Sequence, residues 1–106
     1  MHISTTPYIN GHEIQSNKGC VFSQVVRGFA IGQGFFDGFR AIAGERSSGH
    51  EELIEQIRAE ALKEIKEEAA RVGANAIVGL QVEIDPVSLR DRPMILAKAS
   101  GTAVVI

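Results

Sequence analysis

The feature that most constrains this sequence is a long amphipathic helix predicted over residues 49–72. Ser48 and Glu51 have the S-x-x-E spacing of a capping box, in which each side chain satisfies a free backbone N–H of the other residue. Gly73 favours the left-handed conformation that ends a helix. At about 1.5 Å per residue the helix is roughly 36 Å long. Its apolar residues form one stripe: Ile54, Ile57, Ala61, Ile65, Ala69 and Val72, widened by Leu53 and Leu62.

Strands are predicted before this helix. Asn10-Gly11 favours a two-residue turn, which is expected to join a short strand near residues 3–6 to one beginning near Glu13. Residues 20–26 are β-branched and aromatic, as in a strand. A short helix is predicted over residues 35–43, where aromatic and aliphatic residues recur at helical spacing.

Strands are also predicted after the helix. Residues 76–84 alternate between apolar and small or polar side chains, as in a strand with one buried face. Asp85-Pro86 is expected to end this strand, and a polar loop over residues 87–93 leads to a last strand over 94–106. The residues expected to share the buried face are Val78, Leu80, Val82 and Ile84.

The resulting order is β-β-(short α)-α-β-β. Strands segregated from one main helix indicate an α+β fold of two layers, an antiparallel sheet with one long helix on one face. A chain of 106 residues is expected to form a single domain, residues 1–106.

Composition argues against several function classes. The net charge is -2 and there is no run of Lys or Arg, so no nucleic-acid partner is expected. The single cysteine cannot form an intrachain disulfide. The N-terminus resembles no signal peptide and no apolar run is long enough to span a bilayer, so a cytoplasmic location without a membrane partner is expected.

The possible soft metal ligands are Cys20 and the histidines at positions 2, 12 and 50. None has the local spacing of a zinc motif. A divalent or heavy-metal site would therefore be assembled from distant residues, with Cys20 and His50 as candidates within the subunit or across its interface. The alternative is that Cys20 is a small buried residue and that His50 lies exposed in the first helical turn.

The segment before the long helix holds the other candidates. Gly32 to Gly38 has G-x-G-x-x-x-G spacing, which is not the dinucleotide fingerprint. Arg40, Arg46 and Ser47 are candidate ligand-binding residues, although such a loop is more often only a connection. No nucleophile–base pair can be named, so no catalytic residue is assigned and enzymatic activity is not expected. The four phenylalanines here serve as core, subunit interface or ligand pocket: Phe29, Phe35, Phe36 and Phe39.

The order of motifs along the whole chain resembles the YbjQ family of small bacterial and archaeal proteins, which carries a heavy-metal-binding label. Each motif is weak alone, and their order and spacing together are specific. The matching residues are Thr5-Thr6 before Asn10-Gly11, Gly19-x-Val21, Phe39-Arg40-x-Ile42-x-Gly44-x-Arg46-Ser47, Ala61-Leu62, Gly73-Ala-Asn-Ala-Ile-Val-Gly79 and Ser100-Gly-Thr-Ala-Val104.

The resemblance implies a dodecin-like subunit that assembles with copies of itself into a ring, typically a pentamer, and implies no established activity. The chain departs from the family pattern at Glu45, where many members have Gly, and at His50, where many have Tyr. Cys20 is not part of a family ligand set. The sequence is therefore interpreted as a homo-oligomeric small-ligand or scaffold binding module of unknown function, with a heavy-metal-binding protein as the alternative.

Overall fold

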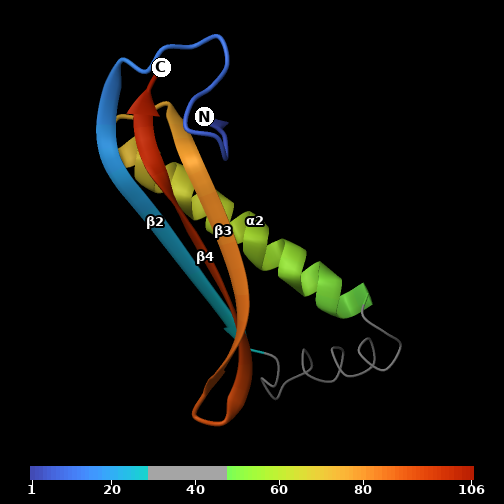
Figure 1. Ribbon diagram of the computed structural model, residues 1–106. Coiled ribbons are helices and arrows are strands. Elements are labelled where there is room, and N and C mark those ends of the chain that lie inside the picture. Colours follow the sequence, from blue (N-terminus) through green and yellow to red (C-terminus); the bar gives the residue numbers. More distant parts are fainter. Residues whose placement is uncertain (29–47) are drawn as a thin grey trace.

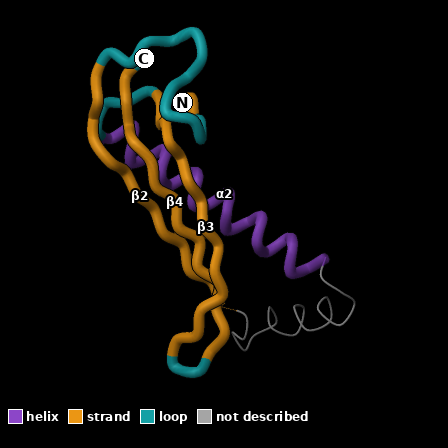
Figure 2. Tube along the Cα trace, in the orientation of Figure 1, coloured by secondary structure: helices purple, strands orange, loops and turns teal. Residues whose placement is uncertain are grey.

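The computed structural model describes residues 1–28 and 48–106. The four strands form one mixed sheet in the order β1-β3-β4-β2, and the single described helix, α2, lies along one side of it (Figures 1 and 2). The expected α+β class is confirmed. The short helix expected over residues 35–43 lies outside the described residues. The elements are β1 (His2–Ile3), β2 (Ser16–Gly28), α2 (Ser48–Arg71), β3 (Ala76–Leu89) and β4 (Arg92–Val105).

Helix α2 has nearly the bounds that its sequence predicts. After Arg71 the backbone N–H of Gly73 donates to the carbonyl of Ala70, and the N–H of Ala74 donates to the carbonyl of Ala69. Gly73 has a φ of 86°, so these two bonds form a Schellman motif around a left-handed glycine. Val72 is 44% exposed, so its place in the apolar stripe was wrongly predicted, because the chain turns away at Gly73. The buried stripe has a strict spacing of four: Leu53, Ile57, Ala61, Ile65 and Ala69.

The N-terminal segment differs from the predicted hairpin. The Asn10-Gly11 turn is present, closed by the His12 N–H donating to the Ile9 carbonyl, and Gly11 has a φ of 84°. The bridge between Ile9 and His12 does not continue into a ladder. Strand β1 instead pairs in parallel with the start of β3, so the sheet is not purely antiparallel as expected.

Strands β3 and β4 form a longer hairpin than the sequence predicts. The strand does not end at Asp85-Pro86, and the loop expected over residues 87–93 is reduced to a two-residue turn. Arg90 and Asp91 have φ values of 52° and 63°. Two adjacent positive φ angles are typical of the type I′ turn, whose twist matches that of the flanking strands.

The two prolines of this hairpin do not interrupt its ladder. Leu89 and Arg92 flank the turn as a register pair, so they exchange both backbone hydrogen bonds, and pairs with and without such bonds alternate from there. Pro86 and Pro93 both fall at positions without them, opposite Ile95 and Ser88. The N–H that each proline lacks would therefore point away from the partner strand, which is why the hairpin tolerates both.

A β-bulge at Gly79 changes which side chains of β3 face the helix. The register passes from Val78 opposite Thr102 to Gln81 opposite Ser100, which leaves one extra residue on β3. Gly79 has a φ of 63°. Ile77 before the bulge and Leu80 after it belong to the core under α2, whereas Val78 packs on the opposite face. The prediction that Val78 shares a face with Leu80 was therefore wrong.

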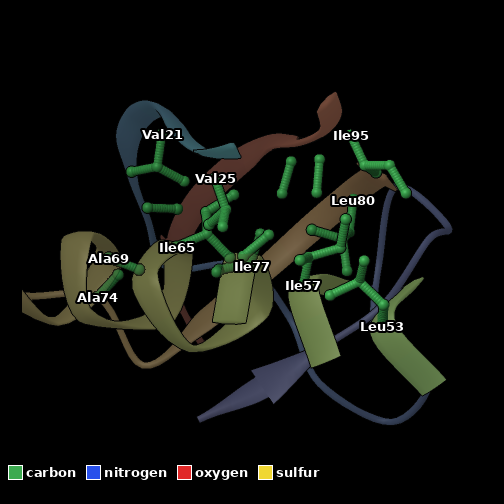
Figure 3. Close-up of a cluster of buried hydrophobic side chains, with 14 residues drawn as sticks. Val21, Val25, Leu53, Ile57, Ile65, Ala69, Ala74, Ile77, Leu80 and Ile95 are labelled. Carbon is green, nitrogen blue, oxygen red and sulfur yellow. The ribbon is translucent and has the colours of Figure 1, made fainter. Parts of the chain in front are cut away.

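The core lies between α2 and one face of the sheet (Figure 3). Small side chains on the central strand β4 allow the helix to approach closely: Ala97, Ala99 and Ala103 are all buried. Gly101 continues this row, and a Cβ there would lie 2.6 Å from Ile77 Cγ2. The Ser23 hydroxyl donates to the Ala61 carbonyl at 2.7 Å and so joins β2 to the middle of α2.

Candidate functional site

The sheet face opposite α2 is here called the open face. Its middle part carries a regular set of mostly polar side chains. Val21 and Val25 are buried beneath the helix, so the intervening residues Phe22 and Gln24 point to the other side by strand alternation. The sheet register arranges six side chains in two rows across β2, β4 and β3. One row is Phe22, Ser100 and Gln81, and the other is Gln24, Lys98 and Glu83.

These six side chains line a hollow of about 300 Å³ on the open face, together with the backbone around Ser23 and Ala99. Phe22 is 66% exposed, the largest exposed fraction of any large apolar side chain in the described residues. Lys98 Nζ lies 3.5 Å from Glu83 Oε1, and both side chains are about half exposed. Such an exposed ion pair contributes only about 0–1 kcal/mol to stability. Its main effect is to leave the hollow without net charge.

Two histidines meet near the N-terminus. The ring centroids of His2 and His12 are 5.7 Å apart, with the ring planes inclined at 42°. Both residues are exposed. The Asn10-Gly11 turn brings them together, since it returns the chain toward β1. The sequence offered no spacing signal for this pair, because the two histidines are ten positions apart.

The candidate metal residues Cys20 and His50 lie on different layers. Cys20 is exposed, so the alternative of a buried cysteine was wrong, and it points to the open face, next to the buried Val21. The backbone of His50 belongs to the first turn of α2, on the other side of the sheet, and its side chain is outside the described part of the chain. The sheet thus separates the two positions within one subunit.

The remaining predicted site residues fall outside the described residues. Among the side chains described within residues 1–28 and 48–106, no three His, Cys, Asp or Glu side chains converge as a metal site. In the same ranges no helix is both long and apolar enough to cross a membrane. The undescribed candidates are the ligand-binding residues Arg40, Arg46 and Ser47 and the phenylalanines Phe29, Phe35, Phe36 and Phe39.

Both outer edges of the sheet are largely unpaired within the described residues. Among the described strands, β2 pairs only with β4, along its whole length. In the part of the chain that the structure describes, the outer side of β3 is covered only at its start, by β1 and by backbone hydrogen bonds in which Gly79 and Leu80 donate to the carbonyls of Thr6 and Ser4. By the alternation set at the hairpin turn, the backbone groups of Phe22 and Gln24 point outward from β2.

The sequence reading missed the polar rows because alternating polar residues on a strand usually mark a solvated face. Phe22 was the available signal. It is the one phenylalanine outside the cluster at residues 29–39, and it occupies a position whose strand neighbours on the same face are polar or small.

Comparison with known proteins places this two-layer chain in a family. The model of the YbjQ family, described as "Putative heavy-metal-binding", matches residues 1–106. The chain belongs to the YbjQ family. Relatives of this YbjQ-family chain include a UPF0145 protein of Actinobacillus pleuropneumoniae, 44% identical over 100% of this chain and 99% of that protein. A UPF0145 protein of Pasteurella multocida is 42% identical over the same shares, and one of Trichodesmium erythraeum is 38% identical over 98% and 97%.

A solved structure shares the fold of this YbjQ-family chain. It is a protein of unknown function of the DUF74 family from Pediococcus pentosaceus, with a TM-score of 0.67 over 100% of this chain and 97% of that one. The two sequences are only 19% identical, so the likeness concerns the fold alone. The names of these relatives state no activity.

Proposed function

We propose that this chain is a homo-oligomeric binding module whose subunits join edge to edge into a closed ring, with five subunits as the family resemblance implies. The observation that carries the proposal is the pair of long sheet edges, β2 on one side and β3 on the other. An unpaired edge presents a row of N–H and C=O groups that can accept another strand.

The two edges are suited to each other. Both β2 and β3 run antiparallel to β4, so they are parallel to one another. A head-to-tail contact between β2 of one subunit and β3 of the next would be a parallel pairing, and repeating it around an axis closes a ring. Closure removes every free edge, as it does in a β-barrel. With α2 on one face of each sheet, the open face would line the other side of the closed wall.

Gln24 provides a test of the edge contact. Gln24→Pro removes an N–H that points outward from β2, so it should preserve the β2–β4 ladder and block a strand added at the edge. Gln24→Ala is the matched control, because it removes the same side chain and keeps the N–H. We expect native mass spectrometry to give five subunits for the parent and Gln24→Ala, and a monomer for Gln24→Pro with an unchanged circular dichroism spectrum.

A parent protein that is monomeric at micromolar concentration would contradict the ring. If Gln24→Pro keeps the subunit number of Gln24→Ala, the contact between subunits does not use the β2 edge. Light scattering at several protein concentrations gives an independent measure of the same subunit number.

We propose metal binding as a second candidate function, favoured by the His2–His12 pair. Because Zn–N bonds are about 2.0–2.1 Å long, two imidazoles that bind one ion have centroids about 5 to 6 Å apart. The observed 5.7 Å fits that separation. The pair supplies two donors, so further donors would come from water or from another subunit, where Cys20 and His50 remain candidates.

The metal hypothesis is tested on protein purified without an affinity tag. If the histidine pair binds the metal, titration with Co²⁺ should produce a visible absorption band that saturates at one Co²⁺ per subunit. His2→Gln and His12→Gln should each abolish this band. Cys20→Ser and His50→Gln are the controls for the pair, and they would abolish the band only if those residues are ligands. Absence of the band, together with no Zn, Cu or Ni by elemental analysis, would exclude this function.

A further inference from the structure

We propose that the hollow on the open face binds a planar, uncharged heterocycle of the nucleobase type, stacked on Phe22 and hydrogen-bonded by the polar side chains beside it. The inference deepens the proposed binding function and rests on it. All six side chains come from one subunit, so the site can be tested separately from ring assembly.

Phe22 supplies a stacking platform. Its side chain is 66% exposed in the middle of a 13-residue strand, and its register partner on β4 is Ser100, not another apolar residue. The remaining members of the two rows are polar. The ring is therefore covered by no apolar neighbour in these rows and presents a π face, on which any base can stack.

The neighbouring side chains supply both kinds of hydrogen-bonding group. Gln81 and Gln24 are exposed, and each amide offers two N–H donors and a carbonyl acceptor. The hydroxyl of Ser100 lies between Phe22 and Gln81 in the register and can donate or accept. The edge of a nucleobase alternates N–H and C=O or ring-nitrogen groups in the same way. A planar ligand lying over Phe22 can therefore be bonded along its edge from β3 and β4.

The charges of the hollow argue for an uncharged ligand. Lys98 and Glu83 are register partners whose charged atoms are 3.5 Å apart, so each offsets the field of the other. A phosphate would be attracted by Lys98 and repelled by Glu83, and a divalent cation would meet the opposite combination. Neither ion gains from the site as a whole.

The size of the hollow and the charge of the chain argue for one ring system and against a polymer. Its volume of about 300 Å³ is at the lower end of the range of small-molecule sites, about 300–1,000 Å³. The chain has a net charge of -2, whereas binding of a polynucleotide depends on neutralising phosphates with Lys and Arg.

The test uses adenosine and uridine as probes, with saturation-transfer NMR to detect contact and calorimetry to measure the dissociation constant. We expect at least one of the two nucleosides to bind. Phe22→Ala should then weaken binding about ten-fold or more, in line with alanine substitution at stacking sites. Phe22→Tyr keeps the π face and should bind within about two-fold of the parent. Adenosine monophosphate should bind no more tightly than adenosine.

Three results would overturn the site. They are no contact with either nucleoside at millimolar concentration, equal affinity of Phe22→Ala and the parent, and a more than ten-fold preference for the monophosphate. Native mass spectrometry of the same samples separates this site from the ring. Loss of nucleoside binding in a Phe22→Ala protein that keeps its subunit number supports the site, whereas a changed subunit number without nucleoside binding assigns Phe22 to a subunit contact.

Discussion

The two faces of the sheet are made by the same three long strands and differ in almost every other respect. Beneath α2 the strands present alanine, valine, leucine and isoleucine, and the described core contains no buried polar or charged residue. On the open face the two polar rows present amides, a hydroxyl and an ion pair around a phenylalanine that is 66% exposed. A small apolar cluster of Ala76, Val78 and Val104 packs on the same face, against Ile9 and Ile106. The larger core therefore lies on the face beneath α2, which leaves the two polar rows of the other face free to be shaped by binding.

The difference between the faces depends on one extra residue. Strand alternation gives each residue of β3 a face, and the bulge at Gly79 changes the parity of that assignment. After the bulge, Gln81 and Glu83 lie beside Ser100 and Lys98 on the open face, and Leu80 lies under the helix. The same core is therefore packed by an odd-numbered residue before the bulge, Ile77, and by an even-numbered residue after it, Leu80.

The largest expected effect is a loss of stability on truncating a core residue, compared with truncating the phenylalanine of the open face. Ile65 is fully buried, so Ile65→Ala should lower the free energy of unfolding by about 2–5 kcal/mol. Phe22→Ala removes a larger side chain from an exposed position and should change it by about 0.5 kcal/mol or less. Urea denaturation of the three proteins at one concentration measures both. Equal losses would mean that the open face is buried in the native assembly.

The next effect concerns Gly101 on β4, where a side chain would collide with Ile77 on β3. Gly101→Ala should cost about 1–3 kcal/mol, because the new Cβ would lie 2.6 Å from Ile77 Cγ2 and 3.2 Å from the Val78 carbonyl. Ser100→Ala, the adjacent change on the open face, is the control. In a double-mutant cycle, Ile77→Ala removes the clashing methyl group, so the two changes together should cost less than their sum.

A smaller effect is expected at the bulge itself. Gly79 has a φ of 63° and open space where a Cβ would lie, so Gly79→Ala meets backbone strain without a clash. The expected cost is about 1–2 kcal/mol. Asn tolerates this conformation better than Ala, so Gly79→Asn should unfold at a lower urea concentration than the parent and a higher one than Gly79→Ala. The reverse order would show that conformation does not limit this position.

The smallest effect concerns the ion pair of the open face. Glu83→Gln and Lys98→Met, alone and together, should show a coupling energy of about 0–1 kcal/mol, since both side chains are half exposed. The coupling should shrink further in 1 M salt. A coupling above about 2 kcal/mol would indicate that the pair is desolvated, and the two faces would then be less different than the exposures suggest.

The helix was the most predictable part of the molecule. Its apolar spacing and Gly73 are local signals, and α2 ends one residue before the predicted end. The strands were less predictable because their pairing is not local. Nothing near His2 indicates that β1 pairs with Ala76, and Pro86 ends a strand only where its N–H is needed by a partner. A bulge is equally hidden, since Gly79 alone does not reveal its φ.

The candidate site shows the same limit. Cys20 and His50 were grouped by chemistry, and the fold places them on opposite sides of the sheet. The open-face rows combine residues from three strands, about 60 to 80 positions apart between β2 and its partners, so only the register reveals them. The His2–His12 pair needed knowledge of the turn as well as of β1. The sequence shows which side chains could form a site, and the fold decides which of them lie close together in space.

The prolines of the β3–β4 hairpin limit how far a strand can be added to this sheet. Pro86 presents no donor on the outer side of β3, and Pro93 presents none on the β2 side, one residue beyond the end of β2. The tip of the hairpin is therefore a poor template for aggregation, while the stem stays available. If the stem edges form the contacts between subunits, the two prolines would keep further chains from adding to the sheet at the tip of the hairpin.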